Sequence, residues 1–111
     1  MAVTSTQSKN PASICNMAHG AYITTGTAAA FKITTGFLPR YVCVVNVAAG
    51  GDVMMEWYEG MAAGSGIKTA IDGTRSLITS LGITVAADGF TVGLDTDLNV
   101  TSEQLYWRAY A

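Results

Sequence analysis

Apolar and polar side chains alternate with a period of two over most of this chain, and glycine-containing turns interrupt the alternation. A period of two places successive side chains on opposite faces of an extended strand, whereas a helix needs apolar residues three and four positions apart. The turns include Gly50-Gly51-Asp52, Asp72-Gly73 and Asp88-Gly89, and the 111 residues contain 12 glycines but only 2 prolines. The pattern predicts short strands joined by tight turns.

The clearest strand is predicted over Arg40–Ala48. Tyr41, Cys43, Val45 and Val47 share one of its faces, and Val42, Val44 and Asn46 share the other with Arg40. Both faces are largely apolar, so we expect this strand to be central in its sheet or covered on its outer side. After the glycine turn, Val53–Glu59 is the expected hairpin partner, with Val53, Met55 and Trp57 on one face and Met54, Glu56 and Tyr58 on the other.

About eight short strands are expected in all, which is the spacing of a two-sheet antiparallel β-sandwich. Few leucines, many β-branched residues and a charged fraction of only 13% agree with an all-β fold. The other predicted strands are Ala21–Thr25, Ala29–Thr35, Thr74–Thr79, Gly82–Val85, Phe90–Val92 and Gln104–Tyr110. Ile67–Ile71 is also expected to be a strand, with one helical turn as the alternative.

The first twenty residues differ from the rest, because they contain no aromatic residue and a single charge, Lys9. Such a segment cannot bury enough apolar surface to fold by itself. We therefore predict an N-terminal arm over residues 1–19 and a β-sandwich domain over residues 20–111. The small apolar cluster of Ile14, Cys15 and Met17 suggests that the later part of the arm docks onto a surface.

Charge and hydropathy exclude several classes of partner. The six basic residues are scattered singly and the net charge is −2, whereas a phosphate backbone is bound by clustered cations, so nucleic acid is not expected. No apolar run is long enough to span a bilayer, and residues 1–7 do not resemble a secretory signal. We therefore expect a protein made in a cytoplasm, with Cys15 and Cys43 as reduced thiols.

Two segments partly match ligand-binding motifs. The stretch Gly60–Thr69 is glycine-rich, but a phosphate-binding loop needs lysine directly after its last glycine, and Ile67 separates Gly66 from Lys68. Asp95, Asp97 and Asn99 have the spacing that opens a calcium loop, but the sixth and twelfth positions lack the required Gly and Glu. An EF-hand is rejected, a looser calcium site stays a minor alternative, and no cofactor or metal is expected.

No catalytic constellation is predicted. His19 is the only histidine, and the sequence places neither a nucleophile nor an orienting carboxylate beside it. Cys15 and His19 would form half of a metal site, but the other ligands are missing. Glu56 and Glu59 should point to opposite faces of one strand, which argues against a concerted acid–base pair. The chain is therefore not expected to be an enzyme.

The remaining candidates are surface residues that alternate with the expected core. Tyrosine, methionine and arginine are enriched at the centres of protein interfaces. The predicted contacts with a partner or with a second copy are Ile14, Met17, Met54, Tyr58, Tyr106, Arg108 and Tyr110. The alternative is that this outer side is covered by a loop or by the arm.

Several segments resemble the small decoration, or cement, proteins on the heads of tailed bacteriophages. The likeness covers Phe37–Tyr110 and leaves out the arm. The segments that carry it are Phe37–Val42, Asn46, Glu56-Trp57, Gly60-Met61, Ile67–Ala70, Asp72-Gly73, Gly82–Val85, Gly89–Gly93 and Leu105–Ala109.

This resemblance implies a jelly-roll-like sandwich that binds the outer surface of an assembled icosahedral capsid. Its partner would be the major capsid protein, with the chain present as a homodimer on the shell. Each copy would contact more than one capsid subunit, so that removal of a subunit breaks additional contacts. The arm would extend across a seam and order only on the shell.

Two other functions stay open. Trp57, Tyr58, Tyr106 and Trp107, with Glu56 and Asn46, have the composition of a carbohydrate-binding module, which presents aromatic faces beside polar groups. A component of a phage tail or fibre would share the fold and would form trimers.

Overall fold

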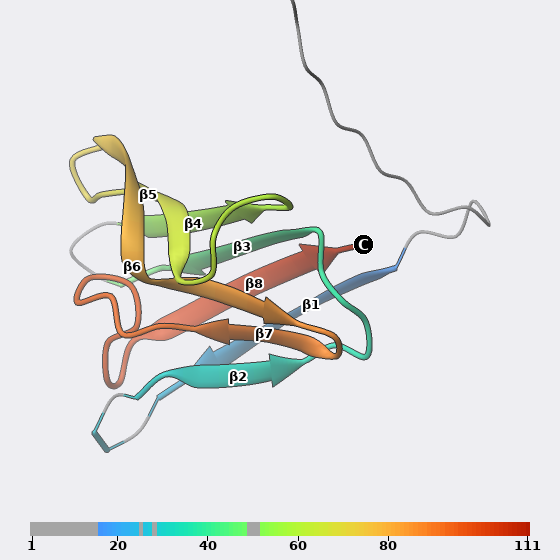
Figure 1. Cartoon of the computed structure of the whole chain (residues 1–111). Coiled ribbons are helices and arrows are strands. Elements are labelled where there is room, and N and C mark those ends of the chain that lie inside the picture. The colour runs from blue at the N-terminus through green and yellow to red at the C-terminus, as the bar shows by residue number, and fades with distance from the viewer. Residues whose placement is uncertain (1–15, 25, 28, 49–51) are drawn as a thin grey trace, which may run out of the picture.

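The structure is a computed structural model that describes residues 16–24, 26–27, 29–48 and 52–111. These residues form eight β-strands and no helix, and every strand runs antiparallel to its neighbours, so the predicted all-β class is confirmed. The strands in Figure 1 are β1 (Met17–Ile23), β2 (Phe31–Thr34), β3 (Tyr41–Asn46), β4 (Val53–Tyr58), β5 (Ser65–Thr69), β6 (Arg75–Ala86), β7 (Gly89–Val92) and β8 (Gln104–Tyr110).

All eight strands belong to one sheet, in the order β1-β8-β3-β4-β5-β6-β7-β2. The sheet curls, so that its two edge strands approach each other at the bottom of Figure 1. The rings of Tyr22 on β1 and Phe31 on β2 stack with centroids 4.6 Å apart, and Phe90 on β7 meets Trp107 on β8 edge to face at 5.4 Å. Because β7 and β8 are not sheet neighbours, the second contact crosses the interior. The arrangement is consistent with the expected jelly-roll-like sandwich.

β3 pairs with β4 and lies inside the sheet, as predicted, and the inward side chains of both strands lie in the core. β3 lies between β8 and β4, and its pairing with β4 runs from Tyr41 opposite Tyr58 to Asn46 opposite Val53. The side chains of Val42 and Val44 are fully buried, and Met55 packs beside them. The other buried apolar residues of the core are Ile33, Val53, Trp57, Ile83, Phe90, Val92, Leu98, Leu105 and Ala109.

Strand β6 turns the corner between the two halves of the curled sheet. Its residues 75–78 pair with β5, and its residues 83–86 pair with β7. Between them Leu81 has a φ of 61°, and a Cβ on Gly82 would overlap the carbonyl oxygen of Ser65. The prediction of two separate strands over 74–79 and 82–85 is wrong, because β6 is one strand over Arg75–Ala86. Its pairing with β5 shifts register at the bend, from Gly66 opposite Ile78 to Ser65 opposite Ile83, and the Gly82 N–H donates to the Gly64 carbonyl at 2.9 Å.

Strand β1 begins inside the segment that was assigned to the arm. Residues 17–19 pair with Tyr110, Ala109 and Arg108 of β8, so the sheet starts at Met17 rather than after residue 19. A polar, small-residue segment can do this because its backbone makes the ladder, and Gly20 leaves room for the Trp107 ring, which a Cβ would approach to 2.9 Å. Residues 1–15 of the predicted arm lie outside the described residues.

The hydroxyl of Tyr22 is buried without a hydrogen-bond partner among the described residues, and this burial raises its pKa from 10.0 to about 12. Between pH 10 and 12 the unfolded chain therefore loses this proton before the folded chain does, and stability falls as the pH rises. We expect Tyr22→Phe to raise the free energy of unfolding by about 1 kcal/mol at pH 7 and to flatten the alkaline decline. Urea unfolding across this range measures both effects, and an unchanged decline would contradict the assignment.

Candidate protein-binding face

The candidate site is the side of β1, β8, β3 and β4 that points away from the core, which we call the outer face. Residues directly opposite each other on paired antiparallel strands project to the same side. The ladder aligns Met17, Tyr110, Tyr41 and Tyr58 in one row across the four strands. The next row contains His19, Arg108, Cys43 and Glu56, and the third contains Ala21, Tyr106, Val45 and Met54.

Six of the seven predicted contact residues lie together on this face. Met17 is 61% exposed, Tyr106 51% and Tyr58 44%, and Arg108 is exposed between them. Met54 and Tyr110 are half-buried by their neighbours on the sheet. The seventh residue, Ile14, lies outside the described residues. The outer face is therefore a contiguous surface on which large exposed side chains surround half-buried ones.

A row of tyrosines stiffens one end of the outer face. The Tyr41 ring stacks on Tyr110 with centroids 5.5 Å apart and meets Tyr58 edge to face at 5.2 Å. Aromatic pairs in these geometries add stability beyond the area that they bury. Tyr41 was not predicted as a contact residue, although the alternation along its strand places it on this face. Because these rings are already held in place, binding of a partner to this row would cost little side-chain entropy.

Glu56 is held in a polar network on the β4 side of the face, in the second row. The Tyr41 hydroxyl donates to Glu56 Oε2 at 2.6 Å, the Tyr58 hydroxyl donates to the same oxygen at 3.4 Å, and Arg75 Nη2 lies 3.0 Å from Oε1. Burial, and then the bond to Glu56, raise the pKa of Tyr41. Glu59 lies beyond the end of β4 and pairs with Arg40 at 3.5 Å, so the two carboxylates are engaged separately.

Beside this network the face is hollowed into a depression of about 480 Å³ between β1, β8 and β3. Cys43 is among the residues that line it, and burial raises the pKa of its thiol above 9.0, which keeps it protonated near neutral pH. Arg108 makes no ion pair with a carboxylate of the described residues. Its hydrogen bond with Tyr41 raises the guanidinium pKa further, so the depression carries a permanent positive charge. The remaining lining residues are His19, Gly20, Ala21, Val45, Tyr106 and Trp107.

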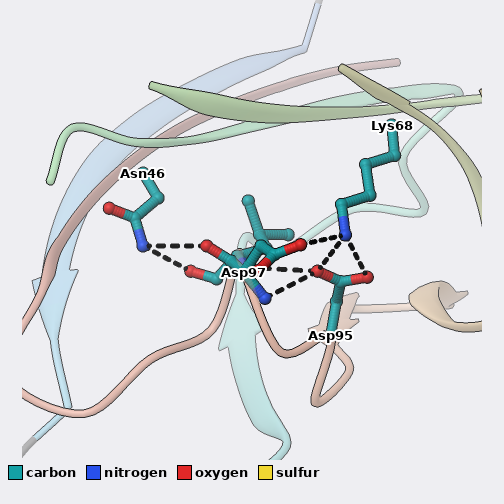
Figure 2. Close-up of polar contacts among 5 residues, drawn as sticks. Asn46, Lys68, Asp95 and Asp97 are labelled. Carbon is teal, nitrogen blue, oxygen red and sulfur yellow. Dashed lines mark hydrogen bonds and ion pairs between the residues drawn. The ribbon is translucent and has the colours of Figure 1, made fainter. Parts of the chain in front are cut away.

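The calcium-like segment is occupied by a cation of the protein itself (Figure 2). Lys68 Nζ lies 2.9 Å from Asp95 Oδ1 and 2.8 Å from Asp97 Oδ2. The Asp95 carboxylate also accepts hydrogen bonds from the backbone N–H groups of Asp97 and Leu98. Among the described residues, no group of three or more histidine, cysteine, aspartate or glutamate side chains is arranged to hold a metal. The ammonium therefore bridges Asp95 and Asp97, and the third residue of the motif, Asn99, instead donates from Nδ2 to the carbonyls of Ala29 and Gly93.

Asn46 extends this cluster from β3. Its side chain is 1% exposed, and its Nδ2 donates to the Leu98 carbonyl at 2.8 Å and to Glu103 Oε1 at 2.9 Å (Figure 2 shows the carbonyl contacts). The segment between β7 and β8 is thus fastened over one end of the core. Lys68 itself lies in β5, which continues into the β5–β6 hairpin and not into a helix, so the surroundings of a phosphate-binding loop are not formed.

Two of the aromatic residues considered for carbohydrate binding face the interior. Trp57 is buried in the core, and Trp107 is half-buried against Phe90. Tyr58 and Tyr106 remain on the outer face. His19 is exposed on β1, in the row of Arg108, and Cys15 lies outside the described residues.

A second exposed surface, on the β5–β6 hairpin, was not predicted from the sequence. Leu77 on β6 is 65% exposed and Ile71 in the hairpin turn is 59% exposed.

No described segment forms a helix that is long and apolar enough to cross a membrane. Comparison of the chain with protein-family models, curated proteins and solved structures finds no match.

Proposed function

We propose that this chain is a structural virion protein that binds the outer surface of the assembled icosahedral head of a tailed bacteriophage. Its partner is the major capsid protein, it cements neighbouring capsid subunits, and it acts as a homodimer on the shell after synthesis in the host cytoplasm. The observation that carries the proposal is the outer face, where Met17, Tyr58 and Tyr106 are exposed around Arg108 on a rigid sheet. Monomeric proteins seldom leave such residues together without a partner.

The composition of the face supports binding to protein. Tyrosine and arginine are the residues that most often dominate interface energies, and Tyr41 and Glu56 hold their neighbours in place before binding. A carbohydrate-binding function is less well supported, because Trp57 and Trp107 are turned toward the core. The resemblance to head decoration proteins then identifies the capsid as the proposed partner.

Tyr106→Glu tests this proposal. The substitution places a charge at the centre of the outer face, and we expect it to weaken binding to purified heads assembled without this protein at least about thirtyfold. The matched control is Leu94→Glu, which adds the same charge to an exposed aliphatic residue in the segment after β7, outside the four strands of the outer face. Co-sedimentation titrations with the heads measure both.

The control should bind within about twofold of the wild type. Equal binding of Tyr106→Glu and the wild type would remove the outer face from the contact. A wild-type protein that stays in the supernatant at all concentrations would reject the capsid as its partner.

A further inference from the structure

The first half of β6 has a strand neighbour on one side only. Residues 75–78 pair with β5, but pairing with β7 begins at Ile83, and no other described strand lies along the second side of residues 75–79. Figure 1 shows this half of β6 standing upright beside β5, before the strand bends toward β7. We call the unpaired side of residues 75–79 the β6 edge.

The hairpin turn fixes which backbone groups point to this edge. The Ala70 N–H donates to the Thr74 carbonyl at 2.9 Å, so these two residues form a hydrogen-bonded pair. Hydrogen-bonded and non-hydrogen-bonded pairs alternate along an antiparallel ladder. Ser76 and Ile78 therefore bond to β5, whereas Arg75 and Leu77 direct their N–H and C=O groups to the β6 edge.

The side chains along the β6 edge do not protect it. Natural sheets guard exposed edges with lysine, proline, bulges or short strands. The edge strand β2 follows this rule, because it has four residues and carries Lys32, which pairs with Asp88 at 2.9 Å. The β6 edge has no lysine or proline, its one charge is Arg75, which is bound to Glu56, and Leu77 is 65% exposed.

We propose that the β6 edge receives an extended segment of the partner, which adds to the sheet as a further antiparallel or parallel strand. The alternation of outward N–H and C=O groups is complementary to a polypeptide backbone in the same extended form. Leu77 favours an apolar residue at the facing position. The inference rests on the proposed function, so the segment belongs to a capsid subunit, and it gives each copy a second contact separate from the outer face.

Variants at Leu77 test this contact on the same purified heads. Leu77→Pro removes the outward N–H, and because the strand side that bonds to β5 is untouched, the fold should persist. Leu77→Thr keeps the N–H and shortens the side chain. We expect about tenfold weaker binding for Leu77→Pro and less than about threefold for Leu77→Thr. If the proline variant fails to fold, Leu77→Lys tests the contact instead, because lysine is one of the residues with which natural sheets guard an exposed edge.

The matched control is Ile71→Lys, which adds the same charge to an aliphatic residue of similar exposure in the hairpin turn, off the strand. It should bind like the wild type. Equal binding of the wild type, Leu77→Pro and Leu77→Lys would overturn the inference and leave the proposed function standing. Equal losses for Leu77→Thr and Leu77→Pro would assign the effect to the side chain and overturn strand addition.

Two other results reject the inference as stated. If the wild type does not bind heads, the proposed function is rejected and the capsid segment with it. If amide hydrogen exchange at Leu77 slows in the free protein as its concentration rises, and Leu77→Pro abolishes self-association, a second copy occupies the edge instead.

Discussion

Lys68→Met is expected to lower the free energy of unfolding by about 3 kcal/mol, because it leaves the carboxylate of Asp95 buried without its counter-charge. The side chains of Lys68 and Asp95 are only 14% and 11% exposed. Burial lowers the pKa of Lys68, but hydrogen bonds from Lys68 to Asp97 and Asp95 outweigh it and raise the pKa above 10.5. The ammonium therefore contributes its full stabilisation at neutral pH, and this contribution is lost as the pH rises above 10.5 through the raised pKa.

The control is the double variant Lys68→Met/Asp95→Asn, which removes both charges and keeps an oxygen for the N–H groups of Asp97 and Leu98. It should recover about 2 kcal/mol of the loss, because an amide costs much less to bury than a lone carboxylate. Chemical unfolding at pH 7 measures the three proteins. No recovery in the double variant would show that the methionine disrupts packing rather than charge balance.

Gly89→Ala is expected to cost about 3 kcal/mol, since overpacking at a site lined by backbone cannot be relieved by a side-chain rotation. A Cβ at Gly89 would overlap the carbonyl oxygen of Ile33 and come within 3.0 Å of Thr34 Cα, both on β2. The short strand β2 pairs only with β7, so the new methyl group would push an edge strand away from the sheet.

Gly36→Ala is the comparison for this substitution. Gly36 has a φ of +88°, and a Cβ there would meet nothing within 4 Å. Only the backbone conformation opposes alanine at this position, and we expect a loss of about 1 kcal/mol. Thermal unfolding compares the two variants, and similar shifts in Tm would contradict a steric origin for the effect of Gly89→Ala.

Much of the central sheet could be predicted because its alternation is local. Arg40–Ala48 and Val53–Glu59 are runs of β-prone residues of strand length, and one glycine turn joins the two runs. The bend at Leu81 could not be predicted, because it depends on the packing of Gly82 against Ser65 of a neighbouring strand. The start of β1 was also missed, since residues 17–20 carry no alternating apolar pattern.

The candidate contact residues also divide into those that the local sequence predicts and those that only the fold brings together. Tyr58, Tyr106 and Tyr110 were predicted from the alternation within their own strands, and the ladder then brings them together. The β6 edge could not be predicted, because it is defined by where pairing with β7 begins. Lys68 and Asp95 were each noted in separate motifs, but only the fold places their side chains in contact.

The pairing of β1 with β8 has a mechanical consequence. Met17 at the start of β1 lies opposite Tyr110 at the end of β8, and the Ala111 N–H donates to the Asn16 carbonyl at 2.9 Å. Tension applied between these two points would peel β1 from β8 one hydrogen bond at a time, as a zipper opens. A load applied along the strand axes from opposite ends of the pair would instead have to break several of these hydrogen bonds at once. The β1–β8 pair should therefore resist force along its strands better than force that separates Met17 from Tyr110.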